Sequence, residues 1–209
     1  MRTIFCILLL ISGTFCWAQK EFQPKDSTIL QTVDGDLDGD QIPEKVIIYN
    51  TTDPGELGNL REIQILKKVN NRWTILEKST NAILDSESGG IMGDPYSGTS
   101  IEKGILIINH FGGSSWKWGY TDKYRYQNGH FELIGHTSSS GRPGDYIKTL
   151  DFNLSTGQIN FKNEVDNTKE YGPSQKETYI KKGIKINLQN RNDQSVKIIL
   201  PKTKQEIFI

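Results

Sequence analysis

The chain has 209 residues, of which 35% are hydrophobic and 24% charged, which is enough apolar material for one domain with its own core. Its 25 basic and 25 acidic residues give a formal net charge of zero and are interspersed, so no basic surface indicates binding to nucleic acid or anionic lipid. Twenty glycines, together with many β-branched and aromatic residues, favour strands joined by tight turns.

Residues 1–18 have the pattern of a secretory signal peptide. A charged start at Arg2 is followed by an apolar run over residues 4–11 and by a small-x-small tripeptide that ends at Ala18. The run is too short to span a bilayer, so we expect cleavage after Ala18, no transmembrane segment thereafter, and a periplasmic or extracellular location. Lipid attachment at Cys16 is the alternative. Both cysteines of the chain lie in this segment, so the exported chain has neither disulfide nor thiol.

The rest of the chain is predicted to form one domain. Residues 19–32 have the character of an N-terminal arm, and residues 33–209 alternate strand-like runs with Gly, Asn, Asp and Pro.

An acidic stretch opens this domain. Residues 34–44, D-G-D-L-D-G-D-Q-I-P-E, place four aspartates and a glutamate just before an apolar run. Calcium takes six to eight hard oxygens around a tight turn, and alternate residues of a curled loop point toward one centre. We therefore predict that this loop binds Ca²⁺. The predicted ligands are the side chains of Asp36, Asp38, Asp40 and Glu44 and the backbone carbonyl of Ile42.

The acidic residues can be aligned with known calcium-binding loops in two ways, and their spacing favours one of the two. A frame from Asp34 has EF-hand spacing, but Lys45 stands where that loop needs its twelfth-position glutamate. The frame from Asp36 resembles the D-x-[DN]-G-D-x-x-x-[DE] loops of FG-GAP and VCBS repeats, which join strands and bind calcium. The chain departs from these families at Gln41, where glycine is usual, and it has one such loop instead of several, so a full propeller is not expected. The alternative is a solvated Asp/Gly turn without an ion.

Turn residues predict three hairpins. Asn70-Asn71 joins strands at 63–69 and 72–77, and Ser155-Thr156-Gly157 joins strands at 149–154 and 158–162. Asn128-Gly129 is favoured in two-residue turns, because both residues can adopt positive φ. The expected cross-strand pairs are Leu66 with Ile75, Tyr126 with Phe131, Arg125 with Glu132, and Tyr124 with Leu133. Further strands are expected at 45–49, 104–109, 178–182, 184–188, 196–200 and 206–209. The fold class is therefore all-β, with antiparallel hairpins in a sandwich or a blade-like meander.

Aromatic residues alternate along the strand that precedes the Asn128-Gly129 turn. Trp116, Trp118, Tyr120, Tyr124 and Tyr126 share one face of a regular strand. We expect this face to be buried, with Trp116 as its most exposed member. The alternative is a glycan- or peptidoglycan-binding surface formed by Trp116, Trp118 and Tyr120, since exposed rings can stack on sugars.

Four stretches resemble an uncharacterised family of exported bacterial proteins, which also opens with an acidic loop. They are G-G-I-M-G-D-P (89–95), H-F-G-G-S-S-W-K-W (110–118), Y-R-Y-Q-N-G-H-F-E-L-I-G (124–135) and D-F-N-L-S-T-G (151–157). The resemblance implies export and the acidic loop, but no activity.

Signals for catalysis are weak. His110 precedes a Gly-Gly-Ser-Ser stretch that matches neither G-x-S-x-G nor a zinc-binding H-x-x-x-H pattern, and Asp94 follows a glycine in a turn. A hydrolase that uses Asp94, His110 and a serine in one cleft is kept as the second alternative. We expect instead a binding or structural role at the bacterial envelope, with an envelope protein or a glycan as partner.

Overall fold

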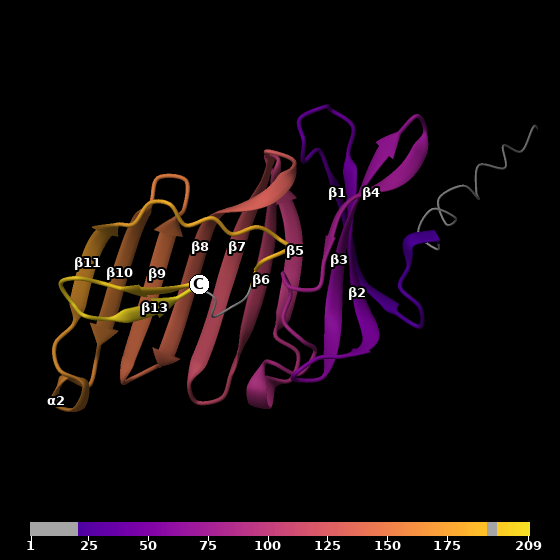
Figure 1. The fold of residues 1–209 in the computed structure, drawn as a ribbon. Helices are drawn as coiled ribbons and strands as arrows, with labels where there is room; N and C mark the ends of the chain where they lie inside the picture. The colour runs from indigo at the N-terminus through magenta and orange to yellow at the C-terminus, as the bar shows by residue number, and fades with distance from the viewer. Residues whose placement is uncertain (1–20, 192–195) are drawn as a thin grey trace, which may run out of the picture.

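The computed structural model describes residues 21–191 and 196–209, so the predicted signal peptide lies outside the described residues and stays a prediction. The described chain is an all-β body, as predicted, and Figure 1 shows its two main sheets. The first contains β1 (Thr28–Gly35), β2 (Glu44–Pro54), β3 (Asn59–Val69) and β4 (Arg72–Ser79). The second contains β5 (Tyr96–Glu102), β6 (Ile105–Gly113), β7 (Lys117–Gln127), β8 (His130–Arg142), β9 (Tyr146–Asn153), β10 (Gln158–Val165) and β11 (Gln175–Ile180).

Both sheets are open antiparallel meanders, because neighbours in each sheet are consecutive in the chain. A short hairpin of β12 (Lys197–Ile199) and β13 (Glu206–Phe208) lies in front of the seven-stranded sheet in Figure 1. Two short helical segments, η1 (Gly90–Met92) and α2 (Thr168–Tyr171), lie in connections between strands. The first sheet begins at Thr28, inside the segment 19–32 that was predicted to be an arm. No helix in the described part of the chain is long and apolar enough to cross a membrane.

The predicted hairpin registers are confirmed. Tyr126 pairs with Phe131, Arg125 with Glu132, and Tyr124 with Leu133, while Leu66 pairs with Ile75. The turn residues adopt the positive φ that their sequence indicates: 54° at Asn128 and 82° at Gly129. The third predicted hairpin also forms, because β9 and β10 are joined through residues 154–157.

The expected strand at 184–188 does not form. Only an isolated bridge links Asn187 to Glu132, although Leu133 N–H donates to Ile186 O and Leu188 N–H donates to Phe131 O. This segment therefore runs beside the start of β8 without becoming a full strand. The physical reason is that Ile186 and Leu188 bury their side chains against the sheet. Two backbone hydrogen bonds are enough to hold them there, so a full strand ladder is not needed.

One core holds the two sheets and the C-terminal segment together. From the first sheet it includes Val46, Ile48, Ile63 and Ile65; from the second, Leu106, Ile108, Tyr124, Phe131 and Phe152; and from the C-terminal segment, Leu188, Ile198, Leu200, Ile207 and Ile209. On the opposite face of the first sheet, a smaller cluster of Ile47, Tyr49 and Leu66 is packed by Phe22 and Trp73. The acidic loop is thus attached to a sheet that is buried on both faces.

Candidate metal site

The acidic stretch forms the connection between β1 and β2. Gly35 and Glu44 are paired at the base of this connection, so residues 36–43 form a loop closed by the sheet. Two residues within it have left-handed backbone, Gly39 at φ 83° and Gln41 at φ 67°. A side chain at Gln41 is therefore held in a backbone conformation that glycine adopts more readily.

Hydrogen bonds within the loop curl its three central aspartates around one point. The Asp36 carboxylate accepts from Gly39 N–H at 2.7 Å and from Gln41 N–H at 3.0 Å. Oδ1 of Asp38 accepts from Asp40 N–H at 3.2 Å, and Oδ1 of Asp40 accepts from Ile42 N–H at 2.8 Å. As a result, carboxylate oxygens of Asp36, Asp38 and Asp40 lie within 4.8 Å of one another.

Glu44 lies beneath this loop. Its side chain is fully buried, and its Oε2 accepts from Leu37 N–H at 2.7 Å. Its Oε1 has no hydrogen-bond partner among the described residues. Burial raises the pKa of the Glu44 carboxyl, and the nearby charges of Asp38 and Asp40 raise it further. Leu37 is itself buried in the main core, so it fixes the loop above the Glu44 carboxylate.

Two lysines offset part of the negative charge of the loop. The Lys67 ammonium, from β3, contacts Oδ2 of Asp38 and lies 2.8 Å from Oδ2 of Asp40. Its hydrogen bonds to Asp38 and Asp40 raise the pKa of Lys67, and the same contact lowers the pKa of Asp40. Lys45 pairs separately with Asp34 at 2.6 Å.

The structure treats the predicted ligands differently: the aspartates cluster, Glu44 is buried at the base of the loop, and the Ile42 carbonyl has no assigned role. Asp36, Asp38 and Asp40 lie together, whereas Glu44 is not part of that cluster; it is buried at the base of the loop with one unpartnered oxygen and stays a predicted ligand. Ile42 donates its N–H to Asp40, and its carbonyl stays a predicted ligand. All of these donors are hard oxygens, the kind that Ca²⁺ and Mg²⁺ prefer. Lys67 was missed because it lies far along the chain and reaches the loop only through the pairing of β3 with β2, which places Leu66 opposite Lys45.

The aromatic row is divided between core and surface. Tyr124 is fully buried, whereas Trp116 is 42% exposed and contacts Tyr146, with 5.3 Å between ring centroids. Trp118 and Tyr120 are half-buried and stack on each other at 6.3 Å. A hollow of about 520 Å³ on the seven-stranded sheet is lined by the exposed Phe111 and by hydroxyl residues that include Thr121, Thr137 and Ser139. Trp118 and Tyr120 also border it, but side chains alternate across a strand, so their rings lie on the opposite face of the sheet, where Tyr120 stacks on the buried His110.

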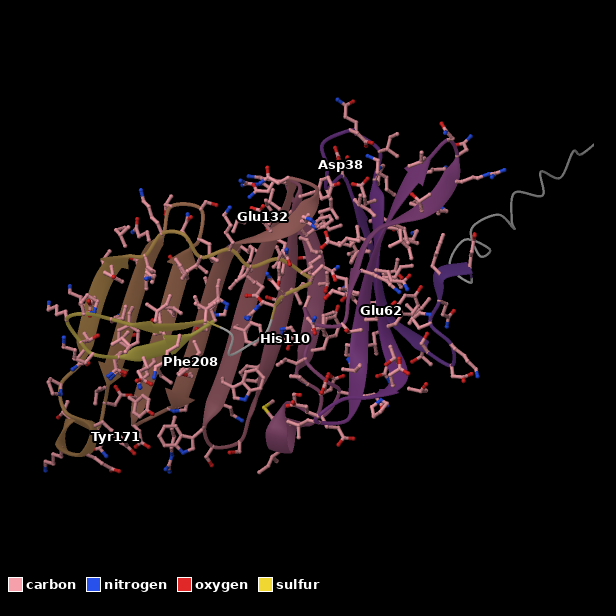
Figure 2. The ribbon with its side chains drawn as sticks, in the orientation of Figure 1. Asp38, Glu62, His110, Glu132, Tyr171 and Phe208 are labelled. Atoms are coloured by element: carbon pink, nitrogen blue, oxygen red, sulfur yellow. The ribbon has the colours of Figure 1, made fainter. Side chains whose placement is uncertain are left out.

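The two candidate catalytic residues make structural contacts. Asp94 is bound by the buried Arg61 at 2.8 Å, and its other oxygen accepts from Tyr96 N–H at 2.9 Å. His110 is 2% exposed, and its Nε2 accepts from Leu84 N–H at 3.2 Å. Figure 2 shows His110 on the seven-stranded sheet, away from Asp38 at the upper end of the first sheet. No hydrogen bond among the described residues joins His110 to Asp94 or to a serine, and the hydrolase alternative stays a prediction.

A buried ionic cluster, which the sequence did not predict, lies within the aromatic row, because Asp122 shares the strand face of Tyr120 and Tyr124. Asp122 is fully buried and binds Nδ1 of His136 at 2.7 Å and Nε of Arg191 at 2.7 Å. His136 reaches this face because β8 has an extra residue, Ile134, at a register shift opposite Lys123 and Tyr124. The bulge turns both Leu133 and His136 inward, although they are three residues apart.

Comparisons with family models, with curated proteins and with solved structures found no match to this chain. The fold and the site define an all-β protein with a candidate divalent-cation loop. Its function has to be inferred from the chemistry of its own residues.

Proposed function

We propose that this chain is an exported calcium-binding protein with a binding or structural role at the bacterial envelope. The observation that carries the proposal is the convergence of carboxylate oxygens of Asp36, Asp38 and Asp40 within 4.8 Å, on a loop that has the buried Glu44 at its base. An Asp/Gly turn without an ion needs one or two carboxylates for its local hydrogen bonds. It does not need a fourth that is buried with an unpartnered oxygen, because such a group is costly to desolvate.

Calcium is favoured over magnesium by the ligand type and by the shape of the loop. Calcium accepts six to eight oxygens in flexible geometry, whereas magnesium requires a tight octahedron and gives up its waters reluctantly. The four carboxylates and the Ile42 carbonyl would hold the ion, with water at its remaining positions. The bound charge would offset the repulsion between the carboxylates and fix the loop that connects β1 to β2.

Calcium should therefore raise the melting temperature of the mature protein. One site that binds only the folded state adds about 2.7 kcal/mol to the free energy of unfolding at a hundredfold excess of calcium over Kd. Melting is measured in chelator, in millimolar calcium and in millimolar magnesium, for the parent and for Asp38→Ala and Asp40→Ala. Both variants should lose the calcium response, and magnesium should produce a smaller shift than calcium.

Asp34→Asn is the matched control, because it removes an acidic group of the same stretch that pairs with Lys45 outside the cluster. It should keep the calcium response. Equal melting temperatures of the parent in chelator and in calcium would leave the loop a solvated turn and refute the proposal.

Glycan binding is the second candidate function, and the hollow on the seven-stranded sheet favours it. The hollow combines the exposed Phe111 ring with hydroxyl groups, and such surfaces suit sugar rings that stack and form hydrogen bonds. Phe111, which is 42% exposed, was not in the predicted set of Trp116, Trp118 and Tyr120, and the rings of Trp118 and Tyr120 lie on the opposite face of the strand. Trp116 lies at the exposed end of the same row, next to Tyr146.

Phe111→Ala should then weaken retention of the protein on insoluble peptidoglycan several-fold, because a stacked ring contributes about 0.5–1.5 kcal/mol beyond area burial. Phe208→Ala is the matched control, since Phe208 is 47% exposed on β13 and does not line the hollow. It should bind like the parent. Equal losses in both variants, or no retention of the parent, would count against this candidate.

A further inference from the structure

Two carboxylate oxygens of the three clustered aspartates accept no backbone N–H group, and both contact one side chain. Oδ1 of Asp38 and Oδ1 of Asp40 accept backbone N–H groups of the loop itself. Their Oδ2 atoms face Lys67 instead. The Lys67 side chain is 24% exposed, and the Asp38 side chain is 8% exposed, so the contact is partly shielded from water.

We propose that the Lys67 ammonium is an internal counter-ion of the acidic loop, and that a divalent cation binds by displacing it from Asp38 and Asp40. This inference rests on the proposed calcium site and names the group that controls it. The ammonium and the ion require the same two Oδ2 atoms, so they cannot both bind there. Binding is therefore an exchange of one cation for another.

The balance of charge and of hydrogen bonds favours this exchange. Lys67 brings one positive charge to a loop with three clustered carboxylates and Glu44 beneath them. A divalent ion brings two charges and can also coordinate Asp36, which has a carboxylate oxygen within 4.8 Å of those of Asp38 and Asp40. The ammonium itself is readily released, because it is strongly hydrated and sits on a flexible four-carbon stem that is already partly exposed.

The exchange sets both the affinity and the selectivity of the site. Each calcium ion has to break the contacts of Lys67, so the site is weaker than its carboxylates alone would make it. Na⁺ and K⁺ carry the same charge as the ammonium that they would replace, so they gain no electrostatic advantage. The loop also keeps a cation at its centre when calcium is scarce, which limits the repulsion between Asp38 and Asp40.

Lys67→Met tests the proposal, because it keeps the length of the side chain and removes the ammonium. Calcium binding is measured by isothermal titration calorimetry for the parent, for Lys67→Met and for Lys45→Met. Lys67→Met should bind calcium more tightly, roughly two- to thirtyfold, if two partly exposed ion pairs no longer compete. Lys45→Met loses the same charge near the same loop, but its partner is Asp34, so its affinity should change by less than about twofold at physiological ionic strength.

A second measurement uses the unaltered protein. Amine labelling followed by mass spectrometry should show faster modification of Lys67 when calcium is added, while Lys45 keeps its rate. This result would show release of the Lys67 ammonium even if Lys67→Met folds poorly.

The outcomes separate the two proposals. If the parent binds no calcium, the proposed function fails and this inference fails with it. If the parent binds calcium but Lys67→Met binds it no better, or Lys45→Met gains as much, the calcium site stands and the counter-ion role is rejected. Slower labelling of Lys67 in calcium would also overturn the exchange.

Discussion

Asp122→Asn is expected to lower the free energy of unfolding by about 3–5 kcal/mol, because it breaks a buried ion pair and leaves the positive charge of Arg191 facing a neutral amide. Asp122 is fully buried, and Arg191 and His136 are each 3% exposed. Burial raises the pKa of the Asp122 carboxyl, but the His136 hydrogen bond and the Arg191 charge outweigh it and lower this pKa. The carboxylate is thus ionised and held between two elements that lie far apart in the chain.

Urea denaturation at neutral pH measures this effect. Asp151→Asn is the matched control, because Asp151 is an exposed aspartate on β9 of the same sheet and should change stability by less than about 0.5 kcal/mol. The double variant Asp122→Leu, Arg191→Met should be less damaged than Asp122→Asn, since it removes both charges together. A loss for Asp122→Asn no larger than that for Asp151→Asn would show that the pair does not hold the C-terminal segment.

The features that the sequence predicts correctly are local ones. Asn128 and Gly129 carry their own backbone preference, and once the turn is known the register of β7 and β8 follows by counting outward. The same holds for the three clustered aspartates, because their spacing and the hydrogen bonds that curl the loop lie within a few residues.

The features that were missed depend on contacts between distant segments. Lys67 joins the acidic loop from β3, and Arg191 joins Asp122 across 69 positions of the chain. His136 faces Asp122 only because of the bulge at Ile134, which no alternation of polar and apolar residues reveals. Likewise, the alternation of the aromatic row indicates a common face, but the burial along that face depends on what covers it. Tyr124 lies in the main core, whereas Trp116 stays exposed at the end of the sheet.

The second large effect is a loss of stability in mild acid that originates at His110. Burial lowers the pKa of His110 to about 4. The charges of Asp122 and Asp94 raise this pKa by smaller amounts, and those of Arg191 and Arg61 lower it further. The unfolded chain has the ordinary histidine pKa of about 6.5, so it binds a proton in the range where folded His110 does not. The contribution of His110 is therefore complete above about pH 6.5 and is lost as the pH falls toward about 4.

His110→Gln isolates this contribution, because the amide oxygen can still accept the Leu84 N–H and does not titrate. The free energy of unfolding is measured by urea denaturation from about pH 7 to pH 5 for both proteins. The parent should lose about 2 kcal/mol more than the variant over this range. All other groups titrate in both proteins, so the difference between the two curves reports His110 alone. Parallel curves would mean that a proton reaches His110 in the folded state, and the sealed packing of the ring between Tyr96 and Tyr120 would then have to open at mildly acidic pH.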